Sequence, residues 1–237
     1  MKASPGHHTY REIKNQANAW AASLDAANDD IELAAWLRRP RAEALFIGCG
    51  STYYLSLTAA AIWQSVTGMR ASGAPGSELW LFPEKTLPQQ PSLLFTISRS
   101  GRTTETLRAL DTYETMTNGE WLAVTCYEES ELGRRATRML VAREAAEESV
   151  AQTMSFTSML VLAQLAAGLA ADRQDYIGAL QALPPAANQI MATYEPLAKG
   201  LAEDKNLQRF VFLGSGANYG LACEAMLKMK EMSLSSS

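Results

Sequence analysis

The stretch "LLFTISRSGRTTETL", residues 93–107, joins a short apolar run to a polar turn and then to a helix-length segment. The apolar run shows no alternation with polar residues, which is typical of a strand that is buried on both faces. After it, Ser98, Ser100 and Thr103 place hydroxyl groups around Gly101. The stretch therefore predicts a buried strand that ends in a polar loop at the start of a helix.

The same pattern extends outward on both sides of this stretch. Short apolar runs occur at 44–48, 93–98, 121–126 and 139–142, with a weaker one at 69–73. Helix-length segments occur at 52–67, 103–117, 129–137 and 150–171, and a turn is expected at "SGAPGSE", 72–78. Because strand and helix alternate, the pattern predicts an α/β fold: a three-layer αβα sandwich around a parallel, doubly wound, flavodoxin-like sheet.

Helical segments are also expected before and after this region. Residues 9–37 have apolar side chains three or four positions apart, which predicts one or two amphipathic helices. Thr9 and Glu12 have the spacing of a capping box. Paired prolines in "LPPAANQ", residues 183–189, predict a break, followed by a helix at about 186–204.

Two distant segments of the chain are alike. "LFIGCGSTYYLSLTAAA" (45–61) and "VFLGSGANYGLACEAML" (211–227) both run from an apolar strand through G-x-G and a polar turn into a helix. This likeness predicts an internal duplication, and we expect the chain to stop inside its second domain. The expected division is an N-terminal helical segment, a first domain, a linker helix and the beginning of a second, incomplete domain, at 1–40, 41–175, 176–205 and 206–237.

Composition limits the classes of function. Of the 237 residues 47% are hydrophobic and 19% charged, with a net charge of -4, so no basic stripe is present and nucleic acid is not an expected partner. Cys49, Cys126 and Cys223 are too far apart for a CxxC metal site or a disulfide framework. The longest apolar stretch, 159–171, is too short to span a bilayer. We expect a cytoplasmic protein without metal, cofactor or membrane partner.

Three polar loops are expected to meet at one edge of the sheet. They are "GCGST" (48–52), "SRSGRT" (98–103) and "EESVAQT" (147–153). Ligands of open α/β sheets bind at this edge, and the helix that starts near Thr103 would point free N–H groups at the middle loop, which favours phosphate. The alternative is that the hydroxyls only cap a helix, but one cap needs one hydroxyl. Arg99 and Arg102 are either further charges for the site or solvated loop residues.

A nucleotide is a weaker candidate for the ligand. Both glycine loops contain G-x-G, but neither fits G-x-G-x-x-G, because the first lacks the third glycine and the second has Gly220 one place late. No G-K-[ST] motif follows either loop. Dinucleotide binding is therefore disfavoured.

Five segments resemble the SIS (sugar isomerase) domain family, in particular tandem-SIS phosphosugar isomerases and deaminases such as the isomerase half of glucosamine-6-phosphate synthase. They are "TYREIKNQANAW" (9–20), "GCGSTY" (48–53), "SRSGRTTETL" (98–107), "ESVAQTMSFTSML" (148–160) and "FLGSGANYGLACEAMLKMKEMS" (212–233). The resemblance implies a sugar phosphate as ligand. The residues it places around this substrate are Gly50, Ser51, Thr52, Ser98, Arg99, Ser100, Thr103, Val150 and Gln152. The chain departs from the family at Gln152 and Met154, where serine and lysine are common.

The resemblance also implies a catalytic role for Glu231, as the base that moves a proton between C1 and C2 of the open-chain sugar, with Lys228 beside it. Glu224, Lys228 and Glu231 are four and three positions apart and share one helix face. The alternative is an exposed Glu–Lys ion pair of little energetic weight.

Two functions remain open at this point. One is an aldose–ketose phosphosugar isomerase or deaminase acting on an amino-sugar or fructosamine 6-phosphate. The other is a phosphosugar-binding module without catalysis, or a truncated fragment of such an enzyme, because the family's ring-opening histidine and C-terminal lysine have no counterpart. His7 and His8, the only histidines, are expected to be unstructured. A lone strand at Phe210–Leu213 would need a neighbour, so we expect a homodimer or larger assembly.

Overall fold

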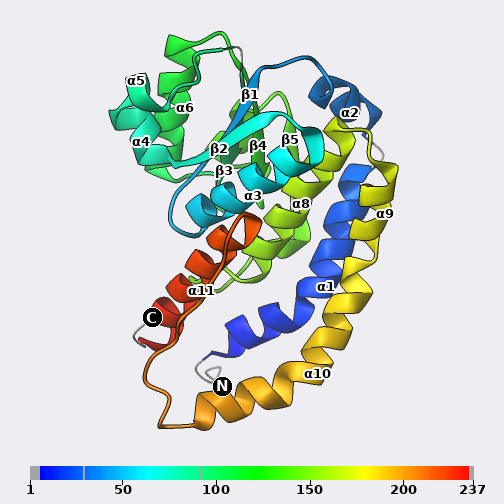
Figure 1. Cartoon of the computed structure of the whole chain (residues 1–237), viewed down its shortest axis with the longest axis vertical. Coiled ribbons are helices and arrows are strands. Elements are labelled where there is room, and N and C mark those ends of the chain that lie inside the picture. The colour runs from blue at the N-terminus through cyan, green and yellow to red at the C-terminus, as the bar shows by residue number, and fades with distance from the viewer. Residues whose placement is uncertain (1–5, 29, 91, 235–237) are drawn as a thin grey trace.

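A five-stranded, all-parallel β-sheet lies between two layers of helices (Figure 1). The computed structural model describes residues 6–28, 30–90 and 92–234. The strands, in the spatial order β2-β1-β3-β4-β5, are β1 (Glu43–Gly48), β2 (Arg70–Pro75), β3 (Ser92–Ile97), β4 (Glu120–Thr125) and β5 (Met139–Val141). The predicted three-layer α/β fold with a doubly wound parallel sheet is therefore confirmed.

Helices cover both faces of this sheet. The helical elements of the described chain are α1 (His7–Asn28), α2 (Ile31–Leu37), α3 (Ser51–Thr67), α4 (Gly76–Leu81), α5 (Pro83–Thr86), α6 (Thr104–Met116), α7 (Glu131–Arg135), a 3₁₀ turn η1 (Arg143–Ala145), α8 (Met154–Ala170), α9 (Gln174–Gln181), α10 (Leu183–Glu203) and α11 (Ala217–Ser233). The apolar core on one face includes side chains from α1, α2, α3, α8 and α9, and the core on the other includes α4, α6 and α7.

The central strands are buried on both faces, which explains why their sequences do not alternate. Phe46 and Phe95, on β1 and β3, stack with ring centroids 4.2 Å apart and meet Trp63 of α3. Leu45 and Ile47 point to the opposite core. Each central strand thus contributes apolar side chains to two cores, as the run at 93–97 predicts.

The chain changes direction between β1 and β3. β1 pairs with β2 on one side and with β3 on the other, and the chain then continues outward through β4 to β5. The loops that follow β1 and β3 therefore leave neighbouring strands at the same edge of the sheet and run in opposite directions. Open α/β sheets bind their ligands at such a point.

Several local expectations are wrong. His7 and His8 form the first residues of α1 instead of an unstructured end. Thr9 and Glu12 do not form a capping box, because α1 starts before them and their side chains contact the loop around Ser149. The expected turn at 72–78 holds the end of β2 and the start of α4, and α8 begins at Met154 instead of Val150. Residues 1–5 lie outside the described part of the chain.

The strand expected at the start of the second domain, residues 210–214, does not form among the described residues. Residues 210–214 belong to no helix or strand, and none of the five strands in the described part of the chain pairs with them. The helix that follows, α11, packs along α3 (Figure 1). Both helices begin after a glycine with nearly the same backbone angles, Gly50 (φ 55°, ψ -124°) and Gly216 (φ 56°, ψ -131°). The repeated turn is thus present, whereas residues 235–237 of the expected second domain lie outside the described chain.

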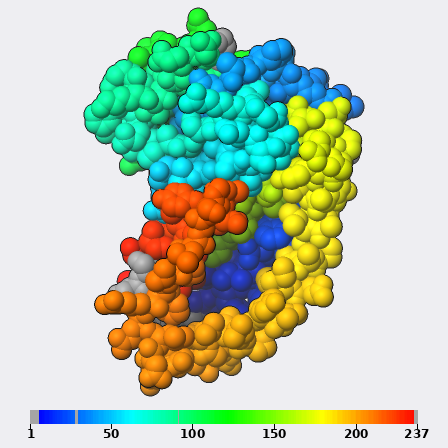
Figure 2. Space-filling view, viewed as in Figure 1, coloured from blue at the N-terminus to red at the C-terminus, as the bar shows by residue number. Residues whose placement is uncertain are grey.

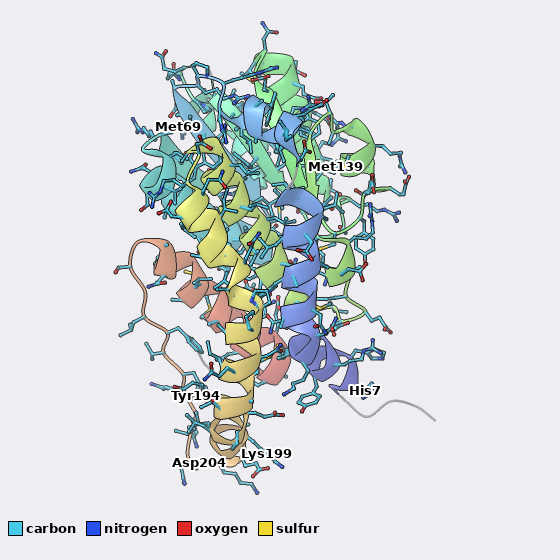
Figure 3. All side chains as sticks on the ribbon, turned by 90° about the vertical axis from the view of Figure 1, so that its right-hand side faces the viewer. His7, Met69, Met139, Tyr194, Lys199 and Asp204 are labelled. Atoms are coloured by element: carbon cyan, nitrogen blue, oxygen red, sulfur yellow. The ribbon has the colours of Figure 1, made fainter. Side chains whose placement is uncertain are left out.

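α10 extends away from the sheet. α10 begins with the paired prolines in its first turn and packs against α1, and the two helices run beyond the sheet layer (Figure 3). Figure 2 shows α10 and the segment after it curving around an opening in which part of α1 is visible. α1 therefore contacts the sheet domain through α8 and the linker through α10.

Candidate functional site

The loop after β3 has a defined shape before any ligand binds. Ser98 is buried, its Oγ accepts the Gly101 N–H at 3.1 Å, and it lies 3.2 Å from the Thr103 hydroxyl. Ser100 Oγ accepts the Arg102 N–H at 3.3 Å. Gly101 has a φ of 59°, and a Cβ there would lie 2.0 Å from the Ser130 hydroxyl. Only glycine fits this position, so the three hydroxyls are held in a preformed turn.

Two helices begin at this edge without a side-chain cap. Thr103 is the N-cap of α6 and Gly50 is the N-cap of α3, and neither makes a side-chain capping hydrogen bond. The alternative in which the loop hydroxyls only cap α6 is therefore wrong. Uncapped N–H groups and the positive ends of two helix dipoles favour an anion at this place.

The loop after β1 has a different internal structure. Thr52 Oγ1 accepts the Cys49 N–H at 2.9 Å and donates to the Cys49 carbonyl at 3.0 Å, so Thr52 stabilises the turn itself. Ser51 is buried and accepts a hydrogen bond from Lys228 Nζ at 3.1 Å. Cys49 Sγ lies 3.7 Å from Thr106 Oγ1, which brings this loop against the first turn of α6.

The polar face of α11 faces α3 and the first loop instead of solvent. Lys228 Nζ lies 3.4 Å from Glu224 and contacts Glu231, while the exposed fractions of the Lys228, Glu224 and Glu231 side chains are 16%, 7% and 40%. The close approach depends on Gly220, where a Cβ would lie 2.3 Å from the Tyr54 carbonyl oxygen of α3. The alternative of an exposed ion pair is therefore wrong for Glu224 and Lys228.

Glu224 was expected on this helix face but was not assigned a role at the site. Its burial raises the pKa of its carboxyl group to about 7, against the smaller opposing effects of Lys228 and Ser51. A carboxyl group with a pKa near neutrality exchanges its proton readily at physiological pH. Its spacing of four residues from Lys228 was the signal in the sequence, but the burial that raises the pKa comes from contact with α3.

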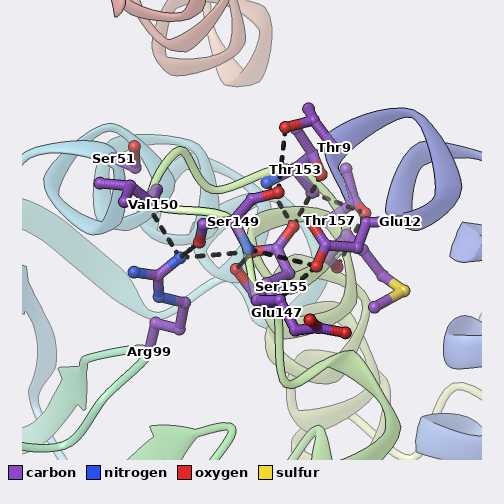
Figure 4. Close-up of polar contacts among 12 residues, drawn as sticks. Thr9, Glu12, Ser51, Arg99, Glu147, Ser149, Val150, Thr153, Ser155 and Thr157 are labelled. Carbon is purple, nitrogen blue, oxygen red and sulfur yellow. Dashed lines mark hydrogen bonds and ion pairs between the residues drawn. The ribbon is translucent and has the colours of Figure 1, made fainter. Parts of the chain in front are cut away.

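The third loop is tied to the second by Arg99 (Figure 4). Arg99 Nη1 donates to the carbonyl oxygens of Ser149 and Val150 at 3.0 and 3.1 Å, and it lies 3.6 Å from the Glu147 carboxylate. Arg99 is therefore not a solvated loop residue. Glu147 in turn accepts the N–H and hydroxyl of Thr153 at 2.7 Å each. The sequence pattern assigned Glu147 no individual role, because its partners Arg99 and Thr153 come from two different loops that meet only in the folded chain.

Two of the hollows beside these loops are lined by predicted site residues. One of about 720 Å³ lies between the start of α1, residues 148–151 and the end of α11, and its lining includes Val150, Glu231, His7 and His8. A smaller one of about 210 Å³ is lined by Arg99, Ser100, Arg102, Tyr127 and Glu147.

The predicted sugar-side residues differ in exposure. Val150 is 92% exposed at the larger hollow. The side-chain carbonyl of Gln152 is buried and has no hydrogen-bond partner among the described residues.

The described residues contain no group of three or more His, Cys, Asp or Glu side chains that is arranged to hold a metal ion. Cys49, Cys126 and Cys223 are all free. Within residues 6–28, 30–90 and 92–234, none of the helices is long and apolar enough to cross a membrane.

The curated proteins that are similar to this chain include aminotransferases with fructose 6-phosphate in their names. The chain is 31% identical over 245 residues to glutamine–fructose-6-phosphate aminotransferase [isomerizing] of Xanthomonas campestris pv. campestris, covering 96% of this chain but 40% of that protein. A corresponding enzyme of Yersinia pseudotuberculosis is 29% identical over 248 residues, with the same coverage. The chain thus spans well under half the length of these relatives.

Solved structures with the same fold include two sugar-phosphate enzymes. The tagatose-6-phosphate ketose/aldose isomerase of Escherichia coli superposes with a TM-score of 0.83 at 25% identity, covering 98% of this chain and 66% of the other. The glucosamine-6-phosphate deaminase of Thermotoga maritima gives a TM-score of 0.79 at 28% identity, covering 97% and 68%. The SIS domain model matches residues 37–169, more than half of the chain. The chain therefore belongs to the SIS domain family.

Proposed function

We propose that this chain binds a sugar phosphate at the edge where β1 and β3 diverge. The observation that carries the proposal is the combination of the preformed hydroxyl loop at 98–103 with two uncapped helix N-termini beside it. Ser98, Ser100 and Thr103, with the loop N–H groups, would hold the phosphate. The relatives, whose names include fructose 6-phosphate, tagatose 6-phosphate and glucosamine 6-phosphate, support this class of ligand.

We further propose that the ligand is an amino-sugar or fructosamine 6-phosphate and that the chain performs the aldose–ketose step on it. Glu231 lines the larger hollow together with Val150, so a sugar that extends from the phosphate loop along 148–151 would approach this carboxylate. Glu231 would take the proton from one carbon and return it to the next, and Lys228 would hold the carboxylate in place. Glu224, with its raised pKa, would be the group that exchanges protons with this pair.

The base is tested by proton exchange. In D₂O and in the presence of the wild-type protein, fructose 6-phosphate should exchange a hydrogen at C1 and glucosamine 6-phosphate the hydrogen at C2, as followed by ¹H NMR. Glu231→Gln should abolish exchange and change the dissociation constant less than about threefold, because the phosphate contacts remain. Lys230→Gln, at the neighbouring exposed position, is the matched control and should keep exchange.

The outcomes separate the two candidate functions. Exchange in the wild type that disappears in Glu231→Gln supports the enzyme. Tight binding of both sugar phosphates without exchange by the wild type selects a phosphosugar-binding module instead. Undiminished exchange in Glu231→Gln would remove Glu231 as the base.

A further inference from the structure

Glu12, in the second turn of α1, makes contacts that helix formation does not require. Its side chain is buried, with 3% of the residue exposed, and its Oε1 accepts the backbone N–H groups of Glu148 and Ser149 at 2.6 and 3.2 Å (Figure 4). Among the described residues, both hydrogen bonds that reach this carboxylate come from the loop 148–150, and its Oε2 has no hydrogen-bond partner.

Burial of such a carboxylate is costly. A carboxylate loses its hydration on burial and regains stability only through charge-assisted hydrogen bonds or an ion pair. Within the described chain, Glu12 makes no ion pair, so the two loop N–H groups are its compensation. An apolar residue would suffice here if the position served only the packing of α1 against α8. Glu12 instead directs a hydrogen-bond acceptor at the loop 148–150.

The loop is held from the opposite side as well. Arg99, which follows β3, donates to the carbonyl oxygens of Ser149 and Val150, and the hydroxyl groups of Thr9 and Ser149 lie 2.9 Å apart. The N–H of Ser149 is thus bound by Glu12 of α1, and its C=O is bound by Arg99 of the loop 98–103. Val150, which lines the larger hollow with Glu231, follows directly.

We infer that Glu12 is a positioning residue that fixes the loop 148–150 at the sugar side of the site, and this inference rests on the function proposed above. The N-terminal helix is then part of the binding site and not only a support for α8. Because Glu12 has no contact with the loop 98–103, its loss should weaken recognition of the sugar while recognition of the phosphate persists.

The experiment compares two ligands by isothermal titration calorimetry: fructose 6-phosphate and inorganic phosphate. In Glu12→Ala, the affinity for fructose 6-phosphate should fall about tenfold, the equivalent of one charge-assisted hydrogen bond, while that for inorganic phosphate changes less than about twofold. Glu12→Gln keeps a carbonyl acceptor and should retain most of the affinity for fructose 6-phosphate that Glu12→Ala loses. Ser23→Ala is the matched control, because Ser23 lies on the same helix, is 2% exposed and bonds only its own backbone at Ala19.

Two results would overturn the inference. One is that Glu12→Ala lowers the affinity for both ligands by the same factor. The other is that Glu12→Ala lowers the affinity for fructose 6-phosphate no more than Ser23→Ala does. If Glu12→Ala does not fold, Thr9→Val replaces it, because this variant removes the hydroxyl contact to Ser149. Thr9→Val should lower the affinity for fructose 6-phosphate by a smaller factor than tenfold and leave that for inorganic phosphate unchanged. An unchanged affinity for fructose 6-phosphate counts against the inference. If the wild type binds neither ligand, the proposed function fails, but hydrogen exchange still tests Glu12. Amide exchange at Glu148 and Ser149 should be faster in Glu12→Ala than in Ser23→Ala, and equal rates contradict the inference.

Discussion

Glu224 is a carboxyl group on the buried face of α11, where burial raises its pKa to about 7 from an ordinary value of 4.5. Ser98 and Glu12 are likewise polar and buried. Each of these side chains is costly to remove from water unless its environment compensates. Ser98 follows β3, Glu224 lies beside Lys228, which contacts the first loop, and Glu12 contacts the third loop, so their burial supports the polar ligand proposed for this region.

Glu224→Gln should change the pH dependence of stability. The folded protein binds the Glu224 proton more tightly than the unfolded chain, so its stabilising contribution is present below pH 4.5 and is lost as the pH rises through about 7. Glutamine cannot ionise, so at pH 8 the variant should be more stable than wild type by about 1–3 kcal/mol, with the difference vanishing near pH 4.5.

Urea unfolding at pH 4.5, 6 and 8 measures this difference. Glu129→Gln, an exposed position, should follow the wild type at each pH. A constant offset between Glu224→Gln and wild type across the three pH values would contradict the raised pKa.

The packing of α11 on α3 determines whether the polar triad Glu224, Lys228 and Glu231 reaches the first loop. Gly220 permits this approach, since any side chain there would meet the Tyr54 carbonyl oxygen at 2.3 Å. Ser51 then accepts its hydrogen bond from Lys228. The function proposed for the triad therefore depends on the contact of α11 with α3, a helix that is far from the triad in the sequence.

Gly220→Ala should destabilise the protein, by about 1–3 kcal/mol, although alanine favours helices. The added Cβ has no room, so α11 must shift away from α3. Gly200→Ala in α10 is the control, because its Cβ would meet nothing within 4 Å; it should raise stability by up to about 1 kcal/mol. Thermal unfolding of both variants checks this, and a stabilised Gly220→Ala would contradict the packing of α11.

The elements that could be predicted are those whose sequence pattern reflects their own burial. β1 and β3 are largely apolar because both their faces are buried, and the polar loop at 98–103 marks the end of such a strand. The contacts of Glu12 and Arg99 with the loop 148–150 join residues that are fifty or more positions apart, and no local pattern encodes them. The prediction of a strand at 210–214 is wrong for the described residues, because a strand also requires a neighbouring strand, and an apolar run alone does not provide one.

At the scale of the whole molecule, the C-terminal third leaves apolar side chains uncovered. Val211 and Leu213 are 81% and 90% exposed, and Ile190, Tyr194 and Leu197 of α10 are each 57% exposed. These residues lie along α10 and the segment that curves around the opening in Figure 2. Exposed apolar surface of this kind marks sites of association between proteins.

We expect the protein to associate as a dimer or larger assembly through this region. Sedimentation velocity should give a dimer or larger species for wild type, and the double variant Val211→Asp, Leu213→Asp should shift it toward monomer, because two charges cannot be buried there without partners. Met116→Asp, at an exposed apolar position on α6, should leave the assembly unchanged. A wild type that is monomeric at all concentrations contradicts the expectation.

The central claim is that the turn after β3 holds the phosphate group of a sugar phosphate. The most direct measurement is an NMR titration of backbone amides with fructose 6-phosphate, with inorganic phosphate as a second ligand. We predict that both ligands shift the amide signals of Ser100, Gly101 and Thr104, and that fructose 6-phosphate alone also shifts Val150. Saturable binding that leaves the amides of residues 98–104 unmoved would contradict the claim.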